Sequence, residues 1–346
     1  MKVAVIGAGV VGLSASAELL NLGVDVTCYD KGDPMSERSS GASRIFRVTH
    51  PTPELVRLAQ LARTGFGRWE EEAGAALIDA SECVISGGEM HTWASAMQDA
   101  GAYFSIVGQD SNRLRLPSRA LPSELLIDHA GGVIDAEMVA EYLTGVTRGV
   151  VRAEPVYALE NGQHGARVWS LGGWTDFDAI IISAGSNTCY LAAQVGIYTP
   201  SALVHHVRFA FVMRQPALLQ CWIDKSEDRL STYQHMSARG EWAVGGHIDP
   251  DQTAWEIGPD KAIAASRDLV VQYVQENLDA IEPQIIGQLY CTETPGLGDG
   301  FKILRNGAVF AVYGHNLFKL APVLGNLLAR AVLEDSNSFD HTDVLS

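Results

Sequence analysis

Three short stretches of the sequence contain residues whose types and spacing are typical of a chemical site. Arg44 and Arg47 stand three residues apart in SSGASRIFR, Lys319 lies between two apolar residues in GHNLFKLAP, and Cys291 opens CTETP. A guanidinium fits a carboxylate through two parallel hydrogen bonds. An ammonium among apolar residues is costly unless it is paired or used. Together these residue types favour a site that receives an anion.

Each of these residues also has a structural interpretation. The two arginines could be solvated charges near a helix start, although cations are unfavourable at that end of a helix. Lys319 could be a solvated loop lysine, and Cys291 a buried thiol, as most free cysteines are. His247, which follows two glycines, and Tyr233 could be ordinary strand residues. These interpretations stay open at the level of single residues.

The composition narrows the class of partner. The 346 residues include 25 basic and 41 acidic ones, a net charge of −16, which disfavours nucleic acid and anionic membranes. Five scattered cysteines without a C-x-x-C pair, and an adjacent histidine pair without ligand spacing, predict neither a disulfide framework nor a metal site. The start MKVAVIGAGVVGL lacks signal-peptide features, and no apolar run approaches the ~20 residues of a membrane span. A soluble, cytoplasmic protein is expected.

The first thirty residues predict a dinucleotide-binding unit. A short apolar strand, residues 2–6, runs directly into GAGVVG and then into a helical segment. In such a turn Gly7 permits the tight bend, Gly9 lets a pyrophosphate approach the backbone, and Gly12 lets helix and strand pack closely. Free N–H groups at the helix start then hold the phosphates. The alternative is a glycine-rich turn with a purely structural role.

Asp30 ends the second strand, VDVTCYD, eighteen residues after the last glycine of the turn. At this distance its carboxylate is expected to accept hydrogen bonds from an adenosine ribose. An acidic residue there disfavours NADP, because it would repel the 2′-phosphate. NAD and FAD both remain compatible with these residues.

The remaining sequence predicts strand-rich segments between nucleotide-binding elements. Apolar residues recur at helical spacing over 53–75, and a second helix follows GGVID. Residues 150–185 alternate like a β-meander and end in the buried run AIIISAG, whose Gly185 is expected to lie close to the nucleotide. Residues 203–247 are again strand-like, a helix follows around 260–279, and the C-terminal part predicts strand, loop and helix. Two interleaved domains are therefore expected.

These motifs together resemble the D-amino-acid-oxidase-type FAD oxidoreductase superfamily, and within it the monomeric sarcosine oxidase and N-methyltryptophan oxidase branch. The resemblance runs nearly end to end and follows the family's order. It is carried by the N-terminal glycine fingerprint, SSGASRIFR, GGVID, AIIISAG, VGGH, CTETPGLGDGF and GHNLFKLAPVLG.

The resemblance implies a role for each candidate residue. Arg44 would lie near the flavin ring, and Arg47 would bind the substrate carboxylate. His247 would face the active site, and Tyr233 would line the substrate pocket. Cys291 would carry FAD covalently as an 8α-thioether.

Lys319 would lie above the flavin, promote its reaction with oxygen and help to hold the substrate carboxylate. The other expected cofactor contacts are Gly7, Gly9, Val11, Gly12, Asp30, Lys31, Ser39, Ser40, Val151, Ala184, Gly185 and Gly314. The small residues before Arg44 would let the backbone pass close to the cofactor.

The implied fold is α/β in the two-domain sense, a Rossmann-like FAD-binding domain interleaved with a mainly antiparallel-sheet substrate domain. The FAD-binding domain is expected over 1–79, 131–198 and 292–346, and the substrate domain over 80–130 and 199–291. A monomer or small homo-oligomer is expected.

The implied activity is oxidation of a small secondary, N-methyl or cyclic amino acid to an imine. Hydride would pass to flavin N5, and O₂ would be reduced to H₂O₂. A glycine- or D-amino-acid-oxidase-like enzyme or a dehydrogenase, either with non-covalent FAD, is the nearest alternative. An NAD-dependent dehydrogenase and a non-catalytic nucleotide-binding protein are alternatives of other classes.

Overall fold

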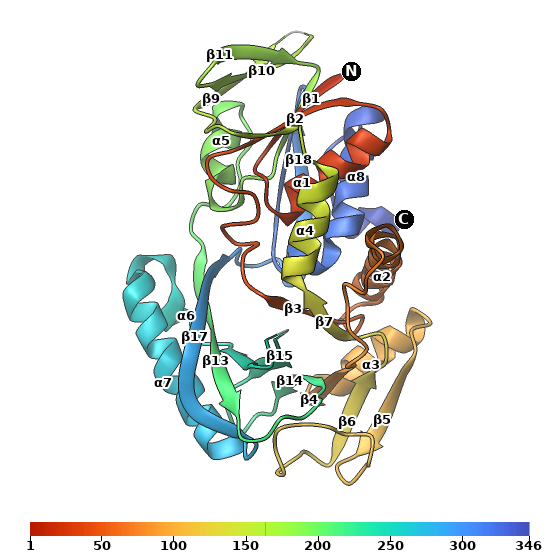
Figure 1. The fold of residues 1–346 in the computed structure, drawn as a ribbon, viewed down its shortest axis with the longest axis vertical. Coiled ribbons are helices and arrows are strands. Elements are labelled where there is room, and N and C mark those ends of the chain that lie inside the picture. Colours follow the sequence, from red (N-terminus) through yellow and green to blue (C-terminus); the bar gives the residue numbers. More distant parts are fainter. Residues whose placement is uncertain (163, 238, 346) are drawn as a thin grey trace. The chain divides into compact units, whose positions relative to one another are not determined.

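A computed structural model describes residues 1–162, 164–237 and 239–345, and the chain in it divides into two compact units (Figure 1). Each unit is assembled from segments that are distant in the sequence, which confirms the predicted interleaved α/β fold. Unit 1 comprises Met1–Ser40, Glu137–Leu203 and Glu293–Ser346, and unit 2 comprises Gly41–Ala136 and Val204–Thr292.

Unit 1 is built on a seven-stranded sheet with the order β20-β18-β19-β12-β1-β2-β8. Its central strands are parallel and nearly continuous in apolar residues, as expected for strands buried on both faces. The two outer strands β18 and β20 are antiparallel. The bounds are β1 Lys2–Ile6, β2 Asp25–Asp30, β8 Val151–Ala153, β12 Ala179–Ile182, β18 Phe301–Asn306, β19 Val309–Gly314 and β20 Phe339–Asp340.

Helices and a small sheet cover this parallel sheet. Helix α1 (Val10–Asn21) packs against α8 (Ala321–Leu333) (Figure 1). The Ser14 hydroxyl donates to the Ala321 carbonyl at 2.7 Å. One sheet face packs its apolar side chains with those of α5 (Thr188–Gln194) and the meander. The meander strands are β9 Ala158–Gly162, β10 Gly165–Ser170 and β11 Gly173–Phe177.

Unit 2 is built on an eight-stranded, mainly antiparallel sheet with the order β17-β13-β16-β15-β14-β4-β6-β5. One face packs against helix α7 (Pro259–Asn277), which Figure 1 shows along β13. The bounds are β4 Cys83–Gly87, β5 Phe104–Gly108, β6 Glu124–Asp128, β13 Val204–Met213, β14 Cys221–Lys225, β15 Thr232–Met236, β16 Trp242–Gly246 and β17 Ile281–Glu293.

Arg44 lies in a strand and Arg47 directly follows that strand, so the interpretation of the segment as a helix start is wrong. Strand β3 (Ser43–Phe46) pairs with β7 (Gly132–Asp135), and both lie in unit 2. Helix α2 (Pro53–Ala73) begins later, where the Thr52 side chain accepts the Leu55 N–H and a proline follows at the first helical position. Segments 41–79 and 131–136 group with unit 2, and the expected extent of the FAD-binding domain over 1–79, 131–198 and 292–346 stays a prediction.

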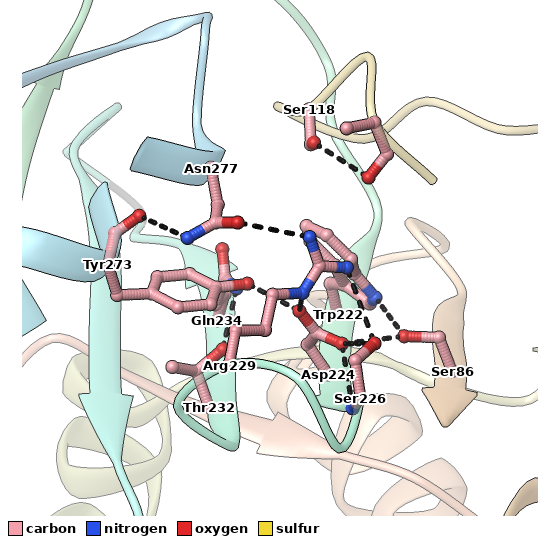
Figure 2. Close-up of polar contacts among 11 residues, drawn as sticks. Ser86, Ser118, Trp222, Asp224, Ser226, Arg229, Thr232, Gln234, Tyr273 and Asn277 are labelled. Carbon is pink, nitrogen blue, oxygen red and sulfur yellow. Dashed lines mark hydrogen bonds and ion pairs between the residues drawn. The ribbon is translucent and has the colours of Figure 1, made fainter. Parts of the chain in front are cut away.

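A buried polar network fixes the strands of unit 2 on the face that packs against α7 (Figure 2). The Asp224 carboxylate is fully buried and accepts hydrogen bonds from Tyr273 at 2.6 Å and Ser86 at 3.0 Å. It also pairs with Arg229 at 2.8 Å. Gln234 of β15 donates to the Tyr273 hydroxyl, which ties β15 to this carboxylate. The residues on the opposite face of β15 are thereby held in place.

The remaining helices are α3 Met90–Asp99, α4 Ala136–Val146 and α6 Pro250–Thr253, with 3₁₀ turns at Gly185–Asn187, Trp255–Ile257, Leu317–Leu320 and Asp343–Leu345. No described helix has both the length and the hydropathy needed to cross a membrane.

Candidate functional site

The glycine turn of unit 1 leaves no room for side chains. Gly7 has φ +104°, a conformation that favours glycine, and a Cβ there would lie 2.5 Å from the Ser183 carbonyl oxygen. A Cβ on Gly12 would lie 1.9 Å from the Gly7 carbonyl oxygen. The turn therefore depends on both glycines, as the fingerprint predicts.

The start of α1 presents backbone N–H groups beside this turn. Gly9 is the N-cap, has no side-chain cap, and lacks a Cβ that would cover the helix end. The Val10 N–H donates to the Ser39 hydroxyl at 2.9 Å, so Ser39 lies at the helix N-terminus. Unsatisfied N–H groups and the helix dipole make this end an anion site. The local geometry fits the pyrophosphate of a dinucleotide such as FAD.

Asp30 lies at the end of β2 and braces the same turn. Its carboxylate accepts the Ala8 N–H at 2.6 Å and the Gly32 N–H at 3.0 Å. Each carboxylate oxygen can accept more than one hydrogen bond, so the expected contact with a ribose hydroxyl is compatible with these bonds. The neighbouring Lys31 is exposed and pairs with Glu37 at 3.1 Å.

The other expected cofactor contacts are spread around the same sheet. Ala184 lies next to the turn, because a Cβ on Gly7 would be 2.9 Å from its Cα. Gly185 follows with φ +57°. Val151 pairs with β2, and the Gly314 carbonyl accepts a hydrogen bond from Thr294 at 3.1 Å. Val11 lies in the first turn of α1, and the Ser40 N–H donates to the Glu37 carbonyl.

Lys319 is a buried, paired lysine in unit 1. Its side chain is 5% exposed and lies 3.1 Å from Asp299, which is 10% exposed. Asp299 also accepts a hydrogen bond from Asn316 at 2.5 Å. A solvated loop lysine is therefore excluded. The carboxylate of Asp299 offsets part of the cost of burying the ammonium.

Unit 2 carries a row of functional groups on the sheet face opposite to α7. In β13 the side chains alternate, so that Val207 and Phe209 pack toward α7 while His206 and Arg208 lie on the other face. Arg208 and Tyr233 are both cross-strand partners of Gly245 in β16. The face of the sheet that bears His206, Arg208, Tyr233, His235, Gly245 and His247 is called the polar face below.

Tyr233 lies across β16 because Gly245 has no side chain. A Cβ on Gly245 would be 2.0 Å from Cζ of Tyr233, and any other residue would displace the ring. The Tyr233 hydroxyl meets Nε2 of His206 in a short hydrogen bond, and the two rings stack at 5.3 Å. The His247 ring is 6.0 Å from the Tyr233 ring. The structure thus brings the predicted Tyr233 and His247 together, and His206 with them.

Arg44 reaches the edge of the polar face from β3. It donates to the Ser43 carbonyl at 2.8 Å, and Arg208 donates to the same oxygen at 3.0 Å. Burial, and then the charge of Arg208, lower the pKa of Arg44 to about 10. Burial likewise lowers the pKa of Arg208. Two cations therefore share one neutral acceptor.

Cys291 is partly buried and lies within electrostatic reach of this pair. A negative charge on its sulfur would raise the pKa of both Arg44 and Arg208. Nearby cations favour the thiolate, which is the nucleophilic form of cysteine. The environment of Cys291 is therefore suited to attack on an electrophile.

Arg47 lies beyond the end of β3 and packs on an aromatic ring. Its guanidinium is 4.9 Å from the Trp93 ring centroid and donates to the Thr49 carbonyl in a short hydrogen bond. The fully buried Asp128 carboxylate accepts the N–H groups of Val48 and Thr49, at 2.6 and 2.8 Å. Asp128 thereby fixes the backbone turn to which Arg47 is bonded.

Sequence reasoning missed several residues of these clusters. Arg208 and His206 could have been found from the alternation in HVRFAF, where His206, Arg208 and Ala210 alternate with large apolar residues. His235 is two residues after Tyr233 and shares its face for the same reason. Asp128 and Asp299 gave no local signal, because their roles arise from partners distant in the sequence. No group of three His, Cys, Asp or Glu residues suited to a metal ion occurs in the described part of the chain.

Comparison with known proteins identifies similar folds. The family model described as FAD dependent oxidoreductase matches residues 2–331. The open form of NikD, described as an unusual amino acid oxidase essential for nikkomycin biosynthesis, has a TM-score of 0.84 at 18% identity, with 98% of this chain and 95% of that chain covered. No curated protein sequence gives a significant match.

Two further solved structures have the same fold. Glycine oxidase from Geobacillus kaustophilus has a TM-score of 0.76 at 16% identity, with 97% of this chain and 95% of that chain covered. L-proline dehydrogenase from P. horikoshii has a TM-score of 0.78 at 14% identity, with 97% and 94% covered. At these identities the likeness concerns the fold.

Proposed function

Since the chain belongs to the FAD dependent oxidoreductase family, we propose that it oxidises a small secondary, N-methyl or cyclic amino acid to the imine, with oxygen as the electron acceptor. FAD supplies the hydride acceptor at N5 and a route for the electrons to O₂, with H₂O₂ as the product. The residues of the glycine turn, the start of α1, Ser39 and Asp30 would hold it.

The observation that carries the substrate side of this proposal is the polar face of unit 2. One face of the sheet is apolar and covered by α7, whereas the other gathers an arginine, a tyrosine and three histidines. Burying a cluster of polar side chains costs free energy, because each polar group loses water and needs a hydrogen-bond partner. A purely structural role does not explain this cost. Clustered titratable groups of this kind are typical of functional sites.

The individual roles follow from the chemistry of the groups. Arg47 would hold the substrate carboxylate through its planar fork, and Trp93 behind it restricts the guanidinium to one orientation. Tyr233, fixed by His206, and His247 would position the amine and keep it neutral, because only a neutral amine has a lone pair to assist loss of hydride. Lys319, held by Asp299, would supply a fixed positive charge for the carboxylate and for the anions that develop during reoxidation.

The similar solved structures support an amino acid as the substrate. They are compatible with either oxygen or another molecule as the electron acceptor. NikD and glycine oxidase are described as oxidases, whereas the similar fold from P. horikoshii is described as L-proline dehydrogenase. A dehydrogenase that passes electrons to another acceptor therefore remains the second candidate.

An anaerobic screen of N-methyl, cyclic and simple amino acids tests the proposed activity. The expected result is that at least one member bleaches the visible flavin absorbance, because hydride transfer reduces the ring. Admission of air should then restore the absorbance within one turnover time and yield H₂O₂. Bleaching that oxygen does not reverse would favour the dehydrogenase. A flavoprotein that no amine bleaches would contradict the proposal.

We further propose that FAD is attached covalently to Cys291. Its partial burial beside two guanidiniums favours the thiolate needed for attack on the flavin. Acid precipitation of the protein is expected to give a yellow pellet, and Cys291→Ser a colourless pellet with a yellow supernatant. Cys189→Ser, at a partly exposed cysteine of unit 1, is the control and should behave like the wild type. A colourless wild-type pellet would leave FAD bound without the thioether.

Arg47→Lys is expected to raise KM for the carboxylate substrate by about tenfold or more, because lysine cannot form the two parallel hydrogen bonds. Steady-state kinetics with the substrate from the anaerobic screen measure this. The control is Arg57→Lys, at an exposed arginine of α2 that donates to the Asp99 carbonyl, and its KM should not change. An unaltered KM in Arg47→Lys would remove Arg47 from the site.

A further inference from the structure

Arg208 is a partly buried guanidinium without a carboxylate partner among the residues that the structure describes. It donates to Nε2 of His235 at 3.2 Å and to the carbonyl oxygen of Ser43 at 3.0 Å. Both acceptors are neutral groups. A guanidinium offers five N–H donors, and two bonds to neutral acceptors leave both donors and charge uncompensated. Desolvating such a charge is unfavourable unless an anion reaches it.

A second guanidinium lies beside the first. Arg44 donates to the same Ser43 oxygen at 2.8 Å, so one nitrogen of each arginine lies within hydrogen-bond distance of a single atom. The repulsion between the two charges is felt by Arg44, whose pKa falls because of burial and then because of Arg208. A single anion placed against both arginines would remove this repulsion.

His235 orients Arg208 but does not neutralise it. Its ring is fully buried, and its pKa lies well below the ordinary value because of burial and then because of Arg208 and Arg44. Since Nε2 accepts a hydrogen bond from Arg208, the proton of the neutral ring is on Nδ1. That nitrogen has no hydrogen-bond partner in the described part of the chain. His235 therefore adds a neutral acceptor and no negative charge.

Two weak acids of unit 2 lie within electrostatic reach of Arg208. If either lost its proton, it could balance the charge of Arg208 in place of a bound anion. A charge on Tyr233 or on Cys291 would raise the pKa of Arg208. The Tyr233 hydroxyl is already bonded to His206. Where FAD is not attached to Cys291, a thiolate at Cys291 is the other group among the described residues that could serve as counter-ion, and the test below includes it.

We propose that Arg44 and Arg208 form a binding site for one small monoanion, a carboxylate group or an inorganic ion of similar size, at the edge of the polar face. The resemblance assigns Arg44 to the flavin ring and assigns nothing to Arg208. The anion has two possible sources, the carboxylate of a bound substrate or a free ion from solution. The site goes beyond the proposed oxidase activity, since binding alone tests it.

Calorimetric titration of the purified flavoprotein with formate, at constant ionic strength set by gluconate, tests the site. Saturable binding of one formate to the site of Arg44 and Arg208 is expected in the wild type, in addition to any formate bound at Arg47. Arg208→Met should weaken it by about tenfold or more, and Arg208→Lys, which keeps the charge but not the fork, by less. The control is Arg214→Met, at an exposed arginine just after β13 that pairs with Glu282, and it should bind formate like the wild type.

Wild-type affinity in Arg208→Met, or no saturable binding in the wild type, would overturn the proposal. If formate binds only to Cys291→Ser, the thiolate is the counter-ion and the proposal also fails. Circular dichroism and thermal melting show whether Arg208→Met is folded, and Arg208→Lys carries the test if it is not. A substrate that displaces formate identifies its own carboxylate as the natural occupant, whereas simultaneous binding identifies a free ion. Failure of every amine in the anaerobic screen would refute the oxidase without affecting this measurement.

Discussion

Gly12→Ala is expected to purify with much less than one FAD per chain. The new Cβ would lie 1.9 Å from the Gly7 carbonyl oxygen and 2.6 Å from the Ser183 hydroxyl, so the backbone of the turn has to move. Overpacking of this kind costs about 1–3 kcal/mol and more where backbone is displaced. At 1.4 kcal/mol per factor of ten, the affinity for FAD should fall about ten- to a hundredfold. The ratio of flavin to protein absorbance measures the loading.

Gly67→Ala is the matched control for that substitution. Gly67 is in the middle of α2, and a Cβ there would meet nothing within 4 Å. Alanine should therefore stabilise the helix by about 0.5–1 kcal/mol and leave the FAD content unchanged. Full FAD loading in Gly12→Ala would show that the turn tolerates a side chain and does not bind the pyrophosphate as proposed.

Asp224→Asn is expected to lower the free energy of unfolding by about 3–5 kcal/mol. The substitution removes the charge that balances Arg229, whose side chain is only 13% exposed, and so leaves a buried guanidinium unpaired. It also weakens the hydrogen bonds that Tyr273 and Ser86 donate to the carboxylate (Figure 2). Chemical denaturation followed by circular dichroism measures the loss.

Asp228→Asn provides the comparison, because Asp228 is exposed and lies in the same connection between β14 and β15. Its effect should stay within about 0.5 kcal/mol. A loss below about 1 kcal/mol in Asp224→Asn would mean that the network does not fix this part of the sheet. Since β15 also carries Tyr233, a destabilised network should disturb the polar face. Tyr273→Phe is a milder second variant, because it removes one hydrogen bond to Asp224 and keeps the ion pair with Arg229.

Local sequence was sufficient to predict the nucleotide-binding turn. Strand, turn and helix are neighbours in the chain, Gly7 is required by its φ angle, and Gly12 is required by its contact with the Gly7 carbonyl. The same holds for α2, whose start follows from Thr52 and Pro53 and whose end follows from Gly74 with φ +66°. The family resemblance added the α/β architecture, and the structure confirms it.

For Lys319 the sequence predicted that the lysine is unusual but did not predict its partner. Its apolar neighbours predicted that a lysine there is either solvated or paired and used. The partner Asp299 became visible only in the fold, because the two residues approach through the antiparallel pairing of β18 with β19. The local sequence does not predict this ion pair, because the pairing register of β18 and β19 brings the two residues together and their separation in the sequence does not.

The polar face was decided by tertiary structure alone. Arg208, Gly245 and Tyr233 come from three strands, and only the register of β13, β16 and β15 puts them in one row. A shift of one residue in any of these strands would turn its polar side chains toward α7. The sequence by itself determined which residues can form the glycine turn and which cations are available. Long-range pairing decided that Arg44 and Arg208 share one carbonyl oxygen, because no local interaction relates two strands so far apart in the chain.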